Sequence, residues 1–354
     1  MRSLRTNKTL RTNVITYAVV VAAFVLFQAL GSAGVLSSTM KGQLVPICAY
    51  VLMALSLNLT VGILGELSLG HAGFMSVGAF AGAVTASAMQ DSVPSSALRL
   101  TVAVLVGAAL AAIVGVLIGI PVLRLNGDYL AIVTLAFGEI IKSIVNNLYI
   151  GMDVNGLHAS FLNNTIVLGE GGRMILSGPM GVPGIKKTAT FAAGFILILI
   201  ALFVIFNLVN SRAGRAIMAL RDNRIAAESV GINVTKYKLM AFVISAAIAG
   251  AGGALYGQAQ NAIIATKFDF NTSILILVFV VLGGMGNMLG SILAAALLTV
   301  LPELLRSLND YRMLIYAIVL ILMMLFNSAP AMIQWREQMT EKLQKTFGKE
   351  KKEG

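Results

Sequence analysis

The sequence has little charge, one cysteine and two histidines, and each shortage excludes a class of protein. Only 12% of its 354 residues are charged, which is about half the share found in an average soluble domain. The single cysteine, Cys48, excludes an intrachain disulfide and any multi-cysteine metal centre. The only histidines are His71 and His158, so a histidine-rich metal site is excluded as well.

The motifs of several enzyme classes are also missing. The sequence contains no G-x-x-x-x-G-K-[ST] stretch, so the chain cannot itself hold and hydrolyse ATP as a P-loop protein does. It has no H-E-x-x-H motif, no G-x-S-x-G motif and no haem-ligating pair of histidines. We therefore expect no catalytic residue, no metal site and no cofactor bound by this chain.

Apolar residues, in contrast, make up 58% of the chain, and the mean hydropathy is +0.88. Several apolar runs reach the roughly 20 residues that a helix needs to cross a bilayer. The first run, Val14–Leu36, is too long for a signal-peptide core, so we expect a retained anchor. The composition predicts an all-α polytopic membrane protein with about ten transmembrane helices (eight to ten). The expected spans are Val14–Leu36, Gln43–Val61, Leu69–Ala88, Leu98–Ile120, Tyr129–Leu148, Ala189–Val209, Leu239–Tyr256, Ser273–Leu282, Leu289–Leu305 and Met313–Phe326.

Basic residues give the expected orientation. The net charge is +11, but most of the lysines and arginines lie in three clusters beside apolar runs. This placement follows the positive-inside rule and does not suggest a nucleic-acid surface. We expect a basic cytoplasmic N-terminus (1–13), a transmembrane domain (14–330) surrounded by lipid, and a charged cytoplasmic tail (331–354). The loop 149–188 would face outward and the basic loop 211–238 would face the cytoplasm, in a multi-pass protein of the plasma membrane.

Two glycine-rich segments interrupt the apolar runs. The first, Leu59–Gly73, places four glycines beside Glu66, Ser68 and His71. Because glycine costs a helix interior about 1 kcal/mol relative to alanine, the segment predicts a broken or re-entrant backbone. Such backbone is tolerated at membrane depth only when protein buries it or when it lines a water-filled cavity. A tight turn at the membrane surface is the alternative, and the segment Gly283–Gly290 has the same two interpretations.

Small residues recur at every fourth position in two of the expected spans. The first line runs from Gly107 to Gly119 and the second from Ser245 to Gly257. Small residues let helix backbones approach closely in a membrane, so these lines predict helix packing within the bundle. A moving or dimer-forming face is the alternative.

Glu139 lies near the middle of the fifth expected span, with Lys142 one turn further on. An acid at the bilayer centre costs on the order of 2.5–3.5 kcal/mol, so Glu139 should face the bundle or a cavity. The i,i+3 spacing lets Lys142 pair with it. A structural pair and a residue of a transport path both fit this pattern. The candidate path residues are Asn58, Gly65, Glu66, Ser68, His71, Glu139, Gly284 and Gly286.

The basic loop predicts two short helices. Ser211–Asp222 has an amphipathic pattern, and Asn223–Gly231 has a second one, with Gly231 at the position that ends a helix in the left-handed conformation. Two short helices with an apolar edge in a cytoplasmic loop indicate a docking element for a partner. A helix lying on anionic lipid is the alternative.

These features leave three classes of membrane protein. The chain could be a channel, a secondary transporter, or the membrane subunit of a pump that another polypeptide drives. A secondary transporter usually has several intramembrane acids for its coupling ions, whereas this sequence offers only Glu139 and Glu66. The docking loop favours the driven subunit.

Four blocks of the sequence carry a resemblance, namely Ala54–Gly73, Gly127–Ile141, Ser211–Gly231 and Val280–Leu305. Together they resemble the M-type permease of bacterial branched-chain amino-acid ABC importers. The resemblance implies an importer of leucine, isoleucine and valine with a second, H-type permease. It also implies two ATP-binding subunits that use ATP and Mg, and an extracytoplasmic amino-acid-binding protein. Urea permeases keep several of these blocks, so a urea or amide importer is the alternative, and an autonomous channel or ion-coupled carrier is a further one.

The block in the basic loop is similar to the E-A-A-x-x-x-G coupling motif of importer permeases. Ala226, Ala227 and Gly231 match the motif, whereas Ile225 stands at its acidic position. The resemblance implies that this segment docks on an ATPase subunit and that the two alanines allow a close approach. The implied coupling residues are Arg224, Ile225, Ala226, Ala227, Glu228 and Gly231.

Overall fold

The computed structural model describes residues 2–34, 37–90, 92–125, 127–153, 156–163, 165–166, 168–169, 172–305 and 311–328. The tail expected at 331–354 lies outside these residues. The chain divides into two units, Met1–Leu297 and Leu298–Gly354, and each is described by itself.

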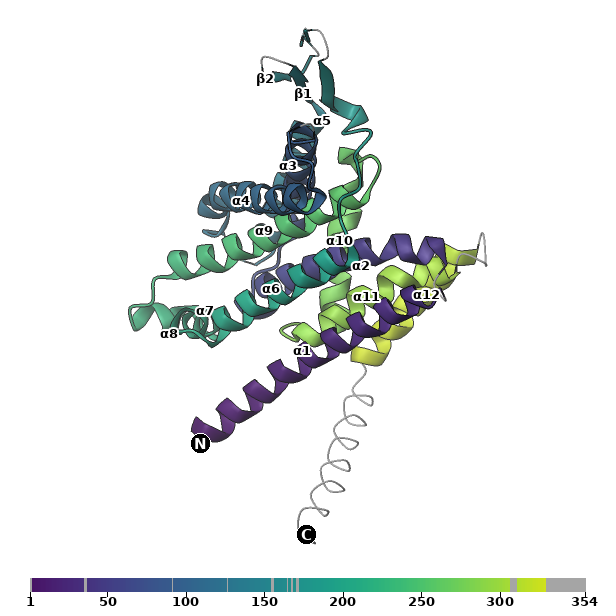
Figure 1. Cartoon of the computed structure of the whole chain (residues 1–354). Coiled ribbons are helices and arrows are strands. Elements are labelled where there is room, and N and C mark those ends of the chain that lie inside the picture. The colour runs from purple at the N-terminus through teal and green to yellow at the C-terminus, as the bar shows by residue number, and fades with distance from the viewer. Residues whose placement is uncertain are drawn as a thin grey trace. The chain divides into compact units, whose positions relative to one another are not determined.

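Helices dominate the first unit (Figure 1). They are α1 (Arg2–Ser32), α2 (Ser38–Asn58), α3 (His71–Ala88), α4 (Ser96–Val122), α5 (Asp128–Asn146), α6 (Phe191–Asn210), α7 (Arg212–Asp222), α8 (Arg224–Ser229), α9 (Val234–Ala259) and α10 (Phe270–Gly283). A π-helical turn, η1 (Leu59–Leu64), continues α2, and the short 3-10 turns are η2 (Gly178–Met180) and η3 (Ala265–Lys267). Helix α11 (Met288–Leu304) begins in the first unit and ends in the second, which also contains α12 (Arg312–Ser328).

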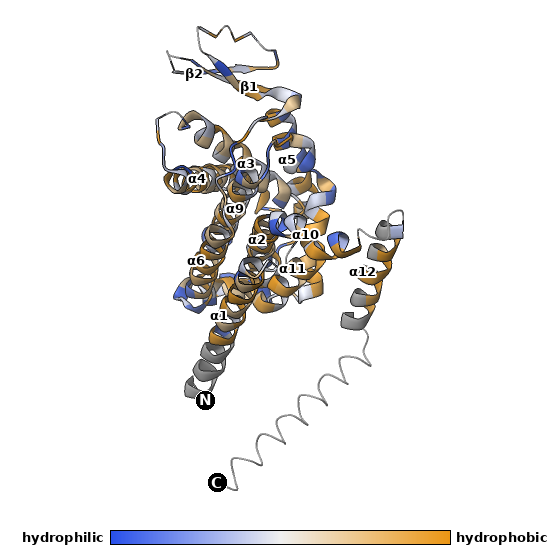
Figure 2. Cartoon of the chain, turned by 45° about the vertical axis from the view of Figure 1, so that its right-hand side comes forward, coloured by the Kyte–Doolittle hydropathy of each residue, from blue (hydrophilic) through white to orange (hydrophobic). Residues whose placement is uncertain are grey.

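Six segments of the described residues are long and apolar enough to cross a membrane. They are Asn13–Ser32, Ser38–Leu64, Ser96–Val122, Phe191–Asn210, Val234–Ala259 and Ala265–Gly283. Figure 2 shows hydrophobic residues along most of α4, α6 and α9. These segments show a polytopic membrane protein but do not confirm the expected count of ten. Two of the other expected spans are less apolar, because α3 is rich in glycine and serine and α5 carries Asp128, Glu139 and Lys142.

The loop 149–188 corrects the expectation of an all-α fold. Three strands, β1 (Leu148–Asp153), β2 (Gly156–Phe161) and β3 (Arg173–Ser177), form an antiparallel sheet in the order β2-β1-β3. Ile150 of β1 pairs with Ala159 on one side and Leu176 on the other. Large apolar and β-branched residues suit a half-buried sheet, but the glycines and asparagines between them concealed this pattern in the sequence.

Helices α3, α4 and α9 pack through their small residues. A Cβ atom at Gly78 of α3 would overlap the backbone of Gly250 on α9. On α4, Gly107 lies against Gly78, and Gly115 lies against Ala246 of α9. The line of small residues on α4 therefore serves helix packing, as expected.

Candidate functional site at the broken helix and the basic loop

The first glycine-rich segment breaks the helix, as the sequence predicts. The chain leaves η1 at Gly65, whose φ is +81°, and becomes helical again only at His71, the first residue of α3. At one end of this segment Glu66 forms an ion pair with Lys238 of α9. At the other end the His71 ring lies 3.1 Å from the Ser245 hydroxyl of the same helix. Since Lys238 and Ser245 are seven residues apart, about 10 Å along a helix, the segment runs along α9, from the exposed Gly65 and Leu67 into the bundle at the buried Ser68.

Residues 65–70 are here called the broken segment. A buried polar cluster holds its inner end, where α2, α3 and α9 meet. His71 Nε2 lies 3.0 Å from Ser56 Oγ and 3.1 Å from Ser245 Oγ. Ser56 Oγ donates to the Met53 carbonyl, and Ser245 Oγ donates to the Ser56 carbonyl at 2.5 Å. Because both hydroxyl protons are already donated, the network assigns the ring proton of His71 to Nε2.

Two buried polar atoms of this region have no partner among the described residues. They are Nδ1 of His71 and Oγ of Ser68, and both side chains are fully buried. Buried polar atoms are usually hydrogen-bonded, so such exceptions are notable. Ser68 and His71 are both candidate path residues, and both are buried at the inner end of the broken segment.

Hydroxyl groups from two other helices satisfy the backbone where α3 begins. The Leu69 N–H donates to Thr134 Oγ1 of α5 at 3.0 Å, and the Ala72 N–H donates to Ser273 Oγ of α10 at 3.1 Å. The first N–H groups of a helix have no partner within the helix itself. The hydroxyls of α5 and α10 therefore hold the inner end of the broken segment through neutral hydrogen bonds.

The second glycine-rich segment packs against the first. Asn58, at the end of α2, accepts a hydrogen bond from the Gly286 N–H at 2.8 Å and donates one to Ser291 Oγ at 2.9 Å. A Cβ atom at Gly62 would overlap the Gly286 backbone. Gly284 and Gly286 have φ values of +88° and +82°, which only glycine adopts easily. The two segments, over 200 residues apart, thus form one contact.

Glu139 lies away from this contact, on α5. It pairs with Lys142, the partner that the i,i+3 spacing predicted. Its side chain is 42% exposed in this chain, and it lines a shallow groove together with Ala72 of α3 and Ser273 of α10. An exposed pair on one helix contributes little to stability, and no contact joins it to Glu66 or His71 among the described residues.

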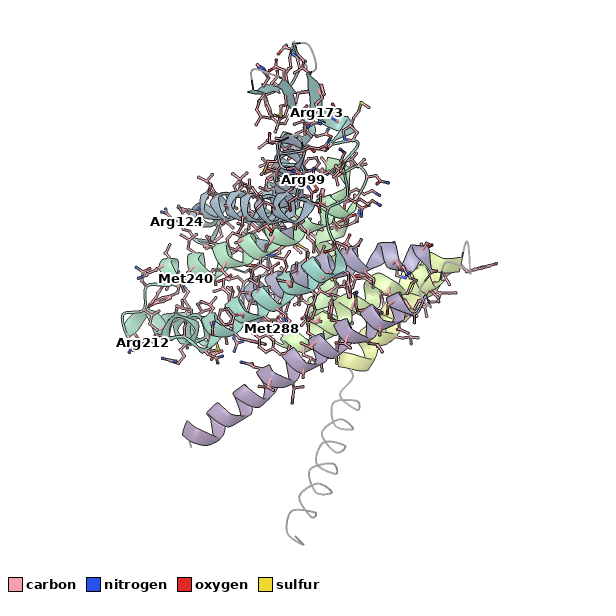
Figure 3. The ribbon with its side chains drawn as sticks, in the orientation of Figure 1. Arg99, Arg124, Arg173, Arg212, Met240 and Met288 are labelled. Carbon is pink, nitrogen blue, oxygen red and sulfur yellow. The ribbon has the colours of Figure 1, made fainter. Side chains whose placement is uncertain are left out.

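The basic loop forms the two expected helices. Ser211 caps α7 by accepting from the Gly214 N–H, and Asn223 caps α8 by accepting from the Ala226 N–H. Gly231 follows α8 with a φ of +83°, and the Ile232 N–H donates back to the Ala227 carbonyl. This is the left-handed helix end that the sequence predicted. Figure 3 labels Arg212 at the start of α7 and Met240 near the start of α9.

The side chains of α8 divide into an outer and an inner face. Ile225 is 79% exposed and the following Val230 is 75% exposed. Ala226 is also exposed, and Arg224 pairs with Glu228 at 3.2 Å. Ala227, in contrast, is only 4% exposed and packs against its own chain. The expectation that both alanines face a partner is therefore wrong for Ala227.

Two residues that the sequence did not single out join the basic loop to the broken helix. Arg221 of α7 donates to the Gly62 carbonyl at 2.9 Å, and its methylene groups lie where a side chain at Gly65 would be. Lys238 of α9 pairs with Glu66. In the sequence both residues indicated only membrane orientation, and only the fold reveals their partners.

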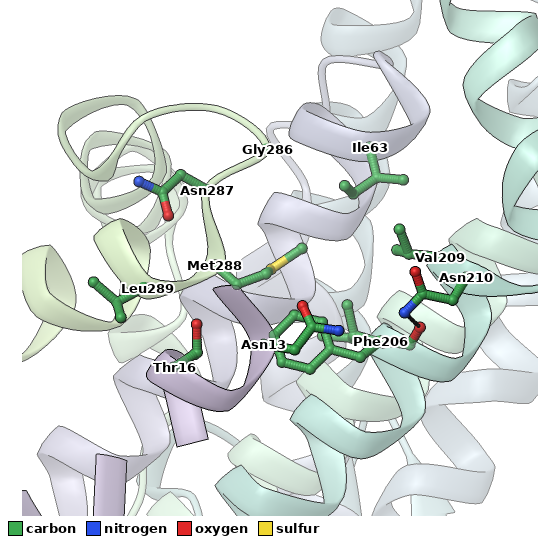
Figure 4. A pocket seen from close by; sticks show the side chains of 11 residues that line it. Asn13, Thr16, Ile63, Phe206, Val209, Asn210, Gly286, Asn287, Met288 and Leu289 are labelled. Carbon is green, nitrogen blue, oxygen red and sulfur yellow. Dashed lines mark hydrogen bonds between the residues drawn. The ribbon is translucent and has the colours of Figure 1, made fainter. Parts of the chain in front are cut away.

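A cavity of about 410 Å³ lies beside the contact between the two glycine-rich segments (Figure 4). Its lining residues are Asn13, Thr16, Ile63, Ile205, Phe206, Val209, Asn210, Gly286, Asn287, Met288 and Leu289. None of them is charged. Among the described residues there is also no group of three or more histidines, cysteines or acids that could hold a metal ion.

Comparison with known proteins places this architecture in a family. Residues 39–325 match the family described as branched-chain amino acid transport system, permease component. The chain is 38% identical over 302 residues to the high-affinity branched-chain amino acid transport system permease protein LivM of Salmonella typhimurium. The matched region covers 82% of this chain and 69% of that protein. Its identity to LivM of Escherichia coli is 37% with the same coverage.

A more distant relative is named for a different substrate. The nucleoside ABC transporter permease protein NupC of Lactococcus lactis is 25% identical over 207 residues, which is 55% of this chain and 59% of that protein. No solved structure matches the chain.

Proposed function

The chain belongs to the family of permease components of branched-chain amino acid transport systems, and we propose that it is the membrane-spanning permease subunit of an ATP-driven importer of leucine, isoleucine and valine. It is a transporter subunit and not an enzyme, because the family consists of transport permeases. The family and the apolar helices together make it an integral protein of the inner membrane.

The similarity to the two LivM proteins supports the proposed substrate. The chain is 37–38% identical to the two LivM proteins over most of its length. It is 25% identical to the nucleoside permease over about half of its length. We therefore propose leucine, isoleucine and valine as the substrates. Urea or another amide is the alternative substrate.

The exposed apolar face beside the loop helices supports the proposed partners. Ile225 and Val230 are exposed on a loop whose basic charge favours the cytoplasmic side, and the sequence itself has no P-loop. In the proposed importer, two ATP-binding subunits bind the cytoplasmic face and use ATP and Mg, and one of them docks on this surface. A second, H-type permease completes the membrane part, and an extracytoplasmic binding protein delivers the amino acid. Both termini are cytoplasmic in this proposal.

The broken segment and the second glycine-rich segment form the proposed translocation path. The support is the non-helical backbone that enters the bundle between Gly65 and His71, together with the unpartnered atoms of Ser68 and His71. In membrane proteins such backbone occurs where protein buries it or where it lines a cavity. The proposed path residues are Asn58, Gly65, Glu66, Ser68, His71, Glu139, Gly284 and Gly286.

Reconstitution into liposomes tests the proposal. The chain alone should show neither ATP hydrolysis nor leucine uptake. With its permease partner, the ATPase subunits and the binding protein, leucine uptake should require ATP, and isoleucine and valine should compete for it while urea should not. Leucine uptake by the chain alone would contradict the class of transporter, and competition by urea would contradict the substrate.

A further inference from the structure

The basic loop makes two contacts at the outer end of the broken segment, and each comes from a positively charged residue. The loop leaves α6, forms α7 and α8, and returns into α9. Its first contact comes from Arg221, the second-to-last residue of α7, and its second comes from Lys238 in the second turn of α9. Helix α8, which carries the proposed docking surface, lies between these two residues along the chain.

Arg221 contacts the end of η1, just before the broken segment begins. Its Nη1 donates to the carbonyl of Gly62 at 2.9 Å, and carbonyls near the end of a helix are those that lack a partner within the helix. The stem of Arg221 covers Gly65, where a Cβ atom would lie 2.5 Å from Arg221 Cγ. Gly65 itself has a φ of +81° and so permits the turn that starts the broken segment.

Lys238 and Glu66 form the second contact. The side chains are 4% and 13% exposed, so water screens the pair poorly. Separating the two groups would leave a buried charge without its partner, which is strongly unfavourable. The outer part of the broken segment and the first turns of α9 are therefore held together as one body.

The inner end of the broken segment is held by neutral groups only. The Leu69 and Ala72 N–H groups donate to the hydroxyls of Thr134 on α5 and Ser273 on α10, and the His71 ring lies 3.1 Å from the hydroxyl of Ser245 on α9. Neutral hydrogen bonds are roughly half as strong as those between charged groups. Because Lys238 and Ser245 both lie on α9, a displacement of that helix with the loop would keep their contacts with Glu66 and His71 and break the hydroxyl contacts with α5 and α10 first.

We propose that Arg221 and the Glu66–Lys238 ion pair are a joint that transmits movement of the docking helix α8 to the broken segment. The proposal rests on the function proposed above. When an ATPase subunit moves α8, the joint pulls residues 65–70 and releases the start of α3 from Thr134 and Ser273. Arg221 and Lys238 are positioning residues, because they act through the broken segment and not on the substrate, whereas their partner Glu66 also belongs to the proposed path.

The test is the number of leucine molecules imported per ATP hydrolysed by the complete reconstituted complex. Glu66→Gln weakens the ion pair with little change in shape, and Arg221→Met removes the contact with Gly62 while keeping an apolar stem. Each variant should assemble with the ATPase subunits and keep binding-protein-stimulated hydrolysis, while leucine imported per ATP falls about tenfold. Exchange of the charges, Glu66→Lys with Lys238→Glu, should recover part of the ratio.

The matched control is Arg212→Met, which removes an exposed arginine from the same helix and should leave the ratio unchanged. An unchanged ratio in both Glu66→Gln and Arg221→Met would overturn the joint. A proportional loss of uptake and hydrolysis would also overturn it, because a merely structural role lowers both. If the wild-type complex hydrolysed no ATP in response to the binding protein, the proposed function would fail instead, before any variant is compared.

Discussion

Single side chains decide which face of α8 is available to a partner. The sequence motif covers Ala226, Ala227 and Gly231 alike, but the structure buries Ala227 and exposes Ile225 and Val230. Covering the exposed isoleucine with a partner would stabilise the contact by about 25 cal/mol for each Å² of apolar surface removed from water. The apolar side chain at the motif's usual acidic position therefore offers packing to a partner where an acid would offer charge.

Ile225→Lys tests this surface, because an acid is the residue that the motif usually carries at this position. The variant would bury an unpaired positive charge in the proposed interface, so binding-protein-stimulated ATP hydrolysis and leucine uptake should both fall about tenfold or more. Co-purification of the ATPase subunits with the permease measures the same loss directly. Thr235→Lys is the control, because it places the same charge at an exposed position on the next helix and should leave all three measurements near wild type.

The partners of several key residues were out of reach of the sequence. Asn58 bonds to Gly286 and Ser291, and Lys238 pairs with Glu66, across separations of more than 170 residues. Helical periodicity relates only residues three or four positions apart. For that reason the Glu139–Lys142 pair could be predicted, and the contacts that join the glycine-rich segments and the loop could not.

At the scale of helices, close backbone contacts hold α3, α4 and α9 together. Little hydrophobic drive exists between helices in lipid, so packing over small residues replaces it. Gly78 of α3 lies between Gly250 of α9 and Gly107 of α4, which makes it the tightest point of this contact.

A comparison of two glycines tests this packing. Gly78→Ala would place a methyl group inside the backbone of Gly250, so the helices must separate, at a cost of roughly 1–3 kcal/mol. Gly42→Ala meets nothing within 4 Å in the first turns of α2, so helix propensity should make it neutral or stabilising by up to about 1 kcal/mol. Thermal unfolding of the two variants in detergent measures the difference, and equal melting temperatures would contradict the packing.

The sequence predicted individual helices better than their depth or continuity. It gave the broken segment, the two loop helices and the end of α8 at Gly231, because glycine positions and helix caps act locally. It did not predict the small sheet of the loop 149–188, since short strands among glycines show only a weak alternation of apolar and polar residues. Nor did it show that residues 65–70 re-enter the bundle beside α9, which depends on contacts with Lys238 and Ser245.

At the scale of the whole molecule, the sheet and the basic loop should lie on opposite sides of the membrane. Between β3 and α7 the described chain contains one apolar helix long enough to cross, α6. The positive-inside rule places the basic loop in the cytoplasm and therefore the sheet outside.

The single cysteine makes this orientation testable without altering the native background. Cys48 is 3% exposed inside α2, so the wild-type chain should react little with a membrane-impermeant maleimide. Leu157→Cys, on the sheet, and Val230→Cys, after α8, place thiols at positions that are 59% and 75% exposed. In cells without the ATPase subunits, the reagent should label Leu157→Cys from outside, and in inside-out vesicles it should label Val230→Cys. Labelling of both variants from the same side would show that α6 does not cross, and the reverse pattern would invert the orientation on which the proposed ATPase contact depends.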